Sequence, residues 1–322
     1  MSKVQLVEFA PAENRAERKK FIDLQWRLYE GDKAWVPPLR LTIEDNLDTK
    51  KNPFYKHARI RLWNAYRGGT HVGRIAAVVD DRHNEFHGEK TGFWGFFECV
   101  DDREVAGALF TAAAAWVKQQ GMTNFRGPAN PSFNHEVGIQ INNFDRAPYV
   151  MMTYTKSYYP QLVEAAGFQK VKDLYAYEMP ATHFNEKVEK IATMVLQKSA
   201  LKFRQINMKK FGEEVEHLLG VYNEAWEKNW GFVPMDADEF RHMAKSMKDI
   251  IWPEFCLMAE NPKGEVVGFS LALPDVNQLL TEIPSGRLLP FGIFKLLGGI
   301  SPKKKKINRV RVITLGVKKA YR

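Results

Sequence analysis

The stretch RVRVITLGVKKAYR, from Arg309 to Arg322, decides the fold of this chain. Val310, Val312 and Thr314 alternate with charged or larger neighbours, and a period of two is the pattern of a β-strand. The pattern predicts a strand over Arg309–Val317. A basic turn follows the strand directly, so the strand leads into a cationic segment.

The bulk composition is typical of a globular protein with anionic partners. The 322 residues give room for about two domains. A content of 45% hydrophobic and 26% charged residues is ordinary for a soluble fold. The net charge of +9 favours CoA, phospholipid headgroups or nucleic acid as partners. Four of the positive charges come from Lys303–Lys306 alone, so the excess is local and does not favour nucleic acid by itself.

Three features predict a cytoplasmic protein. The two cysteines, Cys99 and Cys256, lie in strand-like apolar runs, which indicates a reducing compartment and no disulfide framework. Residues 1–21 lack the apolar core of a secretory signal. No run reaches the ~18 uncharged apolar residues that a transmembrane helix requires.

The first half of the chain alternates strands with helices. Period-2 runs predict strands over Val4–Phe9, Arg59–Tyr66, His71–Asp80, Gly92–Val100, Asn124–Gly127 and Lys170–Met179. Helical spacing and capping residues predict helices over Arg15–Tyr29, Leu41–Leu47, a segment with its N-cap at Asp101 and its C-terminal stop at Gly121, and Tyr158–Ala166.

The same order begins again in the second half. The predicted elements are a strand over Leu201–Ile206, helices over Phe211–Trp226 and Asp236–Ile251, a hairpin of Phe255–Glu260 with Val266–Leu273, and the strand Arg309–Val317. A connecting helix is predicted over Thr182–Leu196. The order gives one domain over 1–180, a connecting helix within 181–200 and a second domain over 201–322.

The strand that ends in Leu315-Gly316-Val317, with the basic turn that reaches Arg322, resembles the cofactor strand of the GNAT acyltransferase superfamily. In that family, free backbone groups of the strand hold the pantetheine arm of acyl-CoA. A glycine loop then grips the pyrophosphate at a helix N-terminus. The resemblance implies an α/β (α+β) fold of two tandem acyl-CoA N-acyltransferase-like domains with mixed, mostly antiparallel sheets. It implies Leu315, Gly316, Val317 and Arg322 as acyl-CoA contacts, and a second domain cut at its phosphate loop.

The first half departs from that family pattern at one place. Where the family has its basic glycine loop, this chain has Asp101-Asp102-Arg103-Glu104. Acidic side chains there repel a pyrophosphate. We therefore expect the first domain to keep the fold without its own CoA site.

A polar loop over residues 126–136 is the densest set of candidate groups in the first half. His135 or Glu136 could deprotonate an amine before it attacks a thioester, and Asn130 and Asn134 could bind the substrate. The alternative is a rigid loop whose Asn side chains satisfy backbone groups.

Four further residues are candidates with structural alternatives. Glu98, on an aromatic strand, could be a desolvated base or could pair with an arginine. Asp275 and Asn277 follow the second hairpin and could line a substrate cleft. Trp230 could line an apolar acyl or lipid channel, although aromatic residues after a helix are more often core.

The segment Leu288–Lys306 combines broken apolar runs with four consecutive lysines. It is too short to span a bilayer and fits a peripheral contact with the inner face of a membrane. The alternative is an insertion that packs on its own domain. His83 and His87 are four residues apart but lie in a predicted loop without a third ligand, so no metal site is expected.

Six segments together resemble the bacterial YghO-like family, which includes ceramide synthases: GFFE at 95–98, RGPANP at 126–131, NHEVG at 134–138, NEAW at 223–226, NWGF at 229–232 and ALPDVN at 272–277. The resemblance implies transfer of an acyl group from acyl-CoA to an amine, with a sphingoid-type lipid amine as one acceptor. Two alternatives stay open: a non-catalytic GNAT scaffold that binds lipid or protein, and an aminoacyl-tRNA-dependent transferase that would use the basic charge for RNA.

Overall fold

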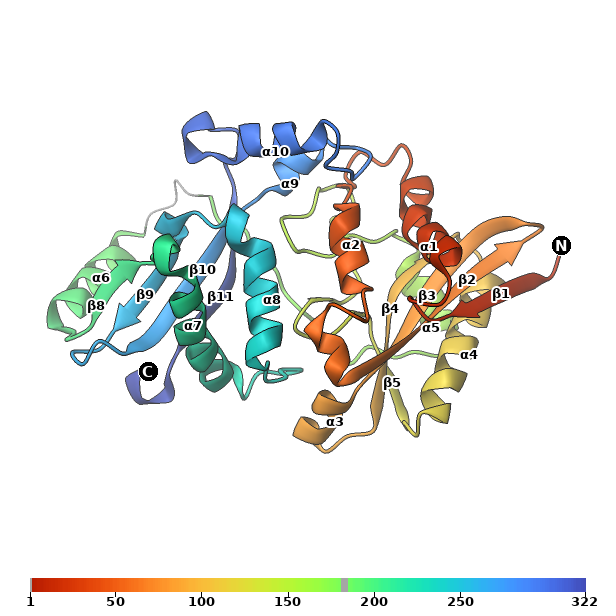
Figure 1. Cartoon of the computed structure of the whole chain (residues 1–322), viewed down its shortest axis with the longest axis horizontal. Coiled ribbons are helices and arrows are strands. Elements are labelled where there is room, and N and C mark those ends of the chain that lie inside the picture. Colours follow the sequence, from red (N-terminus) through yellow and green to blue (C-terminus); the bar gives the residue numbers. More distant parts are fainter. Residues whose placement is uncertain (1, 181–184) are drawn as a thin grey trace.

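The structure is a computed structural model that describes residues 2–180 and 185–322. It has two sheet-based halves that lie side by side along the long axis (Figure 1). Each half packs helices against its own sheet, so the predicted α/β class with mixed, mostly antiparallel sheets is confirmed.

The first sheet has five strands in sequence order. They are β1 (Val4–Phe9), β2 (Ala58–Arg67), β3 (Thr70–Asp80), β4 (Thr91–Cys99) and β5 (Asn124–Arg126). The first three pairings are antiparallel, and β5 runs parallel to β4.

Alternate residues of these strands face two separate cores. Ile75 and Ala77 of β3 point to a core completed by α4 (Arg103–Gln119) and α5 (Tyr159–Ala165). Ala76 and Val78 point to the opposite core, which α1 (Arg15–Leu28) and α2 (Arg40–Asn46) close. Because both faces are buried, β3 has an almost continuous apolar sequence instead of a polar alternation.

The second sheet has the antiparallel order β11 (Val310–Val317), β10 (Val266–Pro274), β9 (Cys256–Glu260), β8 (Lys202–Gln205). This is the order β4-β3-β2-β1 of the first half. Helices α7 (Phe211–Trp226) and α8 (Ala237–Met247) share its core. Asp236 caps α8 by accepting from the backbone N–H of Glu239 at 2.8 Å.

The remaining described elements are short or lie in connections. They are α3 (Asp81–His87), β6 (Ala129–Asn130), β7 (Glu136–Val137), α6 (Glu186–Lys198), α9 (Asn277–Leu280), α10 (Gly292–Ile300) and the 3-10 turns Pro53–Lys56, Met208–Lys210, Lys248–Ile250, Pro253–Phe255, Pro302–Lys304 and Lys319–Tyr321.

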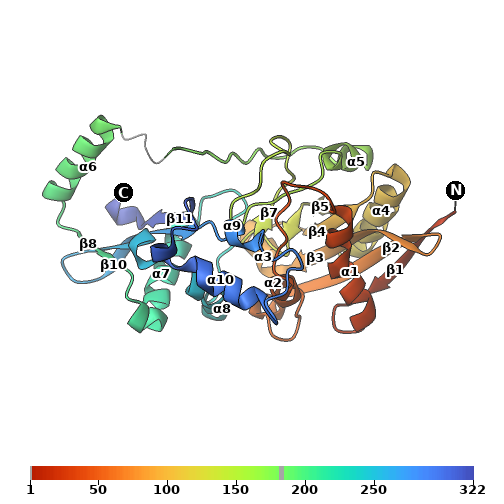
Figure 2. The same cartoon turned by 90° about the horizontal axis from the view of Figure 1, so that it is seen from above.

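Three local predictions are wrong. No strand forms over Lys170–Met179, where Tyr177 is 92% exposed, because alternation alone does not provide a neighbouring strand to pair with. Figure 2 shows the residues up to 180 crossing between the halves as an extended segment. His83 and His87 lie on helix α3, which Asp80 caps, and not in a loop. The N-cap of α4 is Asp102 instead of Asp101, because the Asp102 carboxylate accepts from the backbone N–H groups of the first turn.

The predicted domain division at 180 and 200 stays a prediction. Of the predicted connecting helix, residues 182–184 lie outside the described residues, and α6 begins at Glu186. No helix in the described part of the chain is long and apolar enough to cross a membrane.

Candidate functional site

The two halves contain corresponding irregular strands. In the first sheet, the register between β3 and β4 shifts between Arg74 and Ala76, and Phe96 on β4 has a positive φ of 49°. In the second sheet, the register between β10 and β11 shifts between Leu271 and Ala272. A bulge redirects the backbone groups of a strand and often lies beside a functional site. The two bulges differ in what lies next to them.

In the first half, the chain itself occupies the space beside the β4 bulge. The Asn130 side-chain oxygen accepts from the Phe96 backbone N–H at 2.6 Å. A Cβ atom on Gly95 would lie 1.9 Å from the carbonyl oxygen of Ala129, so glycine is required for this close approach. The space between β4 and β5 is therefore filled by residues 129–130. The expectation that this half lacks its own CoA site stays a prediction.

In the second half, the strand that corresponds to β4 is β11. β11 pairs with β10 alone in the described chain, so the backbone groups on its other side have no strand partner there. Two buried side-chain atoms, Trp226 Nε1 and Thr314 Oγ1, lack a hydrogen-bond partner within the described residues. A Cβ atom on Gly316 would lie 3.3 Å from Trp226 Nε1, which places this donor against the strand. Unpaired polar groups beside a free strand edge fit a ligand that carries amides, such as a pantetheine arm.

The four predicted acyl-CoA contacts gather at the end of this strand. Leu315 is 63% exposed, whereas Gly316 is buried against α7. Arg322 donates to the backbone oxygen of Val317 at 3.0 Å and to that of Ala225 at 2.8 Å. The arginine thereby fixes the turn after β11 against the end of α7.

His135 and Glu136 lie next to each other but in different environments. The Nδ1 atom of His135 is 2.8 Å from the hydroxyl of buried Ser132. Burial, assisted by His242, lowers the His135 pKa to about 4, so the ring is neutral at pH 7. Water reaches the side chain of Glu136, but the surrounding protein desolvates its carboxylate and raises its pKa to about 7. Of the two, Glu136 has the pKa that suits a general base near neutral pH.

The positive charge that acts on Glu136 comes from the other half. Desolvation raises the pKa of Glu136, and the positive charge of Arg311 on β11 opposes this rise because it stabilises the ionised carboxylate. Burial lowers the pKa of Arg311, and the charge of Glu136 opposes that shift. Arg311 also donates to the backbone oxygen of Val150 at 2.7 Å. The sequence analysis missed Arg311, although it lies within the decisive stretch, because its partners are far away in the chain.

Two predicted substrate residues join the loop to the second half. Asn134 donates to the Val233 carbonyl at 3.2 Å and accepts from the Tyr222 hydroxyl at 3.2 Å. The Tyr222 ring stacks on Trp226 with centroids 6.0 Å apart. Trp230 is 41% exposed and packs edge-on against the Phe133 ring. Tyr222 and Trp226, both on α7, therefore connect Asn134 with the position of Gly316 on β11.

The remaining predicted side chains are held by internal contacts. Glu98 is 5% exposed; one oxygen accepts from Gln25 at 2.7 Å and the other from Tyr159 at 2.5 Å. The buried guanidinium of Arg74 lies 3.8 Å away. These contacts and those of Asn130 favour the structural alternative for both residues, and their assignment to catalysis and substrate binding stays an untested prediction.

Asp275 and Asn277 fasten a first-half loop to the second sheet. Fully buried Asp275 accepts from the backbone N–H of Val150 at 2.8 Å and pairs with Arg309 at 2.8 Å. Burial raises the pKa of Asp275, and Arg309 opposes the shift. Asn277 donates to the Pro148 carbonyl at 2.9 Å. Their contacts position the loop that supplies Val150 to Arg311.

One group within the described residues has the spacing of metal ligands. His57, Asp236 and Glu239 place their ligand atoms within 4.8 Å of one another. Arg82 already donates to both carboxylates at 2.8 Å, and His57 Nδ1 lies 2.9 Å from Asp80. A guanidinium between the two carboxylates favours an ion-pair network between the halves over a cation site. The expectation of no metal stays a prediction.

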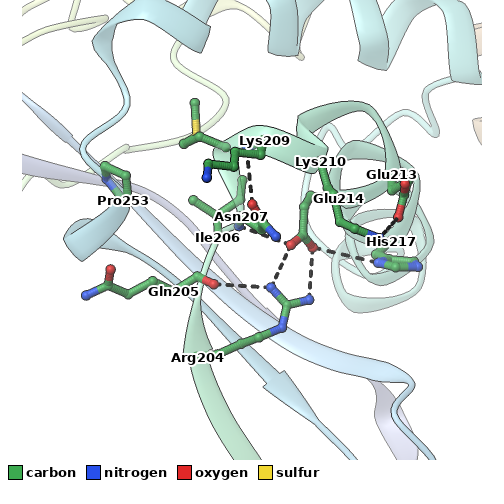
Figure 3. A pocket seen from close by; sticks show the side chains of 11 residues that line it. Arg204, Gln205, Ile206, Asn207, Lys209, Lys210, Glu213, Glu214, His217 and Pro253 are labelled. Carbon is green, nitrogen blue, oxygen red and sulfur yellow. Dashed lines mark hydrogen bonds and ion pairs between the residues drawn. The ribbon is translucent and has the colours of Figure 1, made fainter.

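A hollow of about 670 Å³ lies away from these residues (Figure 3). It is lined by β8 and the start of α7, and β8 is the opposite edge of the sheet from β11. Its arginine, Arg204, is paired: it contacts Glu214 at 2.7 Å and Glu260, outside the lining, at 2.5 Å. We place the candidate site at β11, because unpaired groups occur there.

Comparison with known proteins gives two relatives of nearly full coverage. A bacterial ceramide synthase of Caulobacter vibrioides is 36% identical over 312 residues, which is 97% of this chain and 80% of the relative. Protein YghO of Escherichia coli is 35% identical over 310 residues, 96% of this chain and 78% of the relative. No family model matches the chain.

Among solved structures, a tandem GNAT protein of the clavulanic acid pathway overlays with a TM-score of 0.47 at 12% identity. The overlay covers 84% of this chain and 74% of that structure. A GCN5-related glucosamine N-acetyltransferase region of a fungal β-N-acetylglucosaminidase overlays with a TM-score of 0.48 at 14% identity, over 85% of this chain and 28% of that one. The two sequence relatives are sufficient to assign the family: the chain belongs to the family that contains bacterial ceramide synthase and YghO.

Proposed function

We propose that this protein is an acyl-CoA-dependent N-acyltransferase of the GNAT type. The observation that carries the proposal is a carboxylate whose pKa is raised to about 7, that of Glu136, within electrostatic reach of Arg311 on β11. Family membership supports the same reaction class, since one relative is named a ceramide synthase. That name also supports a sphingoid-type lipid amine as the acceptor.

The proposed acyl-CoA lies along the free edge of β11. Its phosphates lie at the Arg322 end and its thioester near the bulge and Arg311. Six residues separate Arg311 from Val317, a length of about 20 Å along a strand. The unpaired backbone groups of the strand are available to the amides of the pantetheine arm, and binding must displace the side chains that cover Trp226 Nε1 before this donor is reached.

In the proposed reaction, the acceptor arrives as an ammonium ion. The Glu136 carboxylate removes one proton, and the free amine attacks the thioester carbonyl. The new C–N bond forms, the C–S bond breaks, and CoA leaves as a thiolate that takes up the proton lost by the amide nitrogen. The charge of Arg311 favours the ionised form of Glu136 and adds positive charge where the oxyanion develops.

The test is amine-dependent release of the CoA thiol, measured with acetyl-CoA and palmitoyl-CoA against sphinganine. Wild-type activity should rise as the pH passes through about 7, where Glu136 loses its proton. Glu136→Gln should lower kcat by about 100-fold or more and remove this pH dependence, with acyl-CoA affinity changed less than about twofold.

Two matched variants complete the test. Glu44→Gln removes an exposed carboxylate from α2 and should leave kcat unchanged. His135→Gln should act more weakly than Glu136→Gln, because a ring with a pKa of about 4 is a poor base at pH 7. No thiol release by wild type with any amine would overturn the enzyme proposal and leave a GNAT scaffold.

A further inference from the structure

The connection between β10 and β11 carries an apolar helix that is fixed to the body of the protein. The inner side of α10 packs on α9: a Cβ atom on Gly299 would lie 2.5 Å from the Leu279 side chain. Leu296 packs against two of the buried apolar clusters. In Figure 1, α10 lies across the top of the second half and extends toward α1 and α2.

The same connection is attached to the first half as well. Trp26 Nε1 donates to the Pro284 carbonyl at 2.9 Å, and Arg40 Nε donates to that of Ser285 at 2.9 Å. The Arg40 guanidinium also lies 3.6 Å above the Trp26 ring. The orientation of α10 is therefore fixed relative to both halves.

The outer side of this anchored segment is apolar and open. Phe291, Phe294 and Leu297 are 73%, 70% and 58% exposed, and Leu289 just before them is 76% exposed. Phe294 and Leu297 are three residues apart on α10, a spacing that places side chains on one face of a helix, and Phe291 precedes them by the same step. An isolated exposed leucine is ordinary, but a cluster of large apolar groups indicates an interaction surface.

The charged side chains within the segment that carries this face have one sign. Residues 284–308 contain six basic residues and no acidic one. Lys306 lies 3.4 Å from Glu282, and Lys295 donates to the Glu282 carbonyl. Lys303, Lys304 and Lys305 are exposed and form no ion pair within the described residues.

We propose that this face docks on the surface of an anionic lipid bilayer, with Phe291, Phe294 and Leu297 in the headgroup boundary and Lys303–Lys306 against lipid phosphates. A helix of nine residues lies in an interface and does not cross it. Lysines beside an apolar surface favour lipid over protein, because protein interfaces are depleted in lysine while lipid phosphates attract it. This inference concerns a separate surface and does not depend on the proposed reaction.

The test is flotation of the full chain with vesicles. We expect binding to vesicles of 70% phosphatidylcholine and 30% phosphatidylglycerol, and weak binding to phosphatidylcholine alone. Replacing Lys303–Lys306 by glutamine should lower the partition coefficient at least tenfold, since each lysine adds to the attraction. The triple variant Phe291→Ser, Phe294→Ser, Leu297→Ser should lower it similarly and leave the thermal unfolding temperature unchanged.

A matched control removes the same charge elsewhere. Lys187, Lys190, Lys198 and Lys202 lie on or next to α6 and β8, and their replacement by glutamine should keep binding within about twofold of wild type. Equal loss in both lysine variants would show a response to net charge and overturn the proposed surface. Equal binding to neutral and anionic vesicles, or no binding by wild type, would also overturn it. A wild-type dimer in light scattering that becomes a monomer in the triple serine variant would assign the face to self-association instead.

Discussion

The first and second halves build the same strand order around a bulged strand but treat the space beside the bulge in opposite ways. In the first half, β5 pairs with β4, and the side chain of Asn130 accepts a hydrogen bond from the backbone N–H of Phe96 at the bulge. In the second half, β11 is an edge strand in the described chain, next to a buried indole N–H without a partner. Two copies of one topology therefore differ in whether the space beside the bulged strand is occupied by the chain itself or has no strand partner within the described residues.

The comparison predicts that buried polar groups of the first half serve stability. Glu98→Gln leaves the buried Arg74 guanidinium without a counter-charge and should lower the free energy of unfolding by about 4 kcal/mol. The measurement is urea denaturation. Glu104→Gln, which removes an exposed partner of Arg67, should cost less than about 1 kcal/mol. A Glu98→Gln protein that stays stable but loses turnover would instead make Glu98 catalytic.

The filled space beside β4 can be tested with a single methyl group. Gly95→Ala places a Cβ atom against the Ala129 carbonyl and should lower the free energy of unfolding by about 3 kcal/mol. The control is Gly107→Ala on α4, where nothing lies within 4 Å of the added atom, and stability should rise by about 1 kcal/mol. A neutral Gly95→Ala would mean that the first half is as open as the second.

The contact between the halves should depend on pH. Burial opposes the charge of His57, but hydrogen bonds to Asp80 and Glu239 outweigh it and raise its pKa to about 9. The folded pKa lies above the unfolded value of about 6.5. The stabilisation is therefore complete below pH about 6.5 and is lost as the pH rises through about 9, a change of about 2 kcal/mol with partial screening by solvent.

The measurement is the urea midpoint between pH 6 and 9.5, for wild type and His57→Gln. The wild-type midpoint should fall with rising pH and the variant midpoint should stay lower and flatter. Parallel profiles for the two proteins would assign the pH dependence to another group.

The smallest expected effect concerns the indole N–H of Trp226 beside β11 in the second half. Trp226→Phe removes the partnerless donor beside β11, so stability should stay unchanged or rise slightly. Acyl-CoA affinity should fall about fivefold in calorimetry, the loss of one hydrogen bond of about 1 kcal/mol. Trp230→Phe should leave the affinity unchanged. Equal binding by wild type and Trp226→Phe would remove this donor from the site.

Local patterns predicted the elements well where the pattern and the packing coincide. The helix Phe211–Trp226 has the predicted bounds, because its apolar spacing matches the face that it buries. The strand expected over Lys170–Met179 is absent from the structure, because pairing depends on a neighbour that the local sequence does not contain.

The candidate site was harder to predict, because its partners come from distant parts of the chain. His135 and Glu136 were predicted together as candidate bases. Their surroundings, which only the folded chain defines, lower the pKa of His135 and raise that of Glu136. The electrostatic interaction of Glu136 with Arg311 joins residues from the two halves, so no local sequence pattern indicates it. The hydrogen bond from the Phe96 backbone N–H to the Asn130 side chain likewise joins separate segments of the chain.

The extended segment before α6 has a consequence for how the protein can be divided. Residues 169–180 cross between the halves without helix or strand, and Tyr175 and Tyr177 are 76% and 92% exposed. The halves adhere elsewhere, through Arg82 with Glu239 and through Trp26 with Pro284. Backbone continuity and cohesion are thus separate properties here, and we expect a chain cut within this segment to remain one particle.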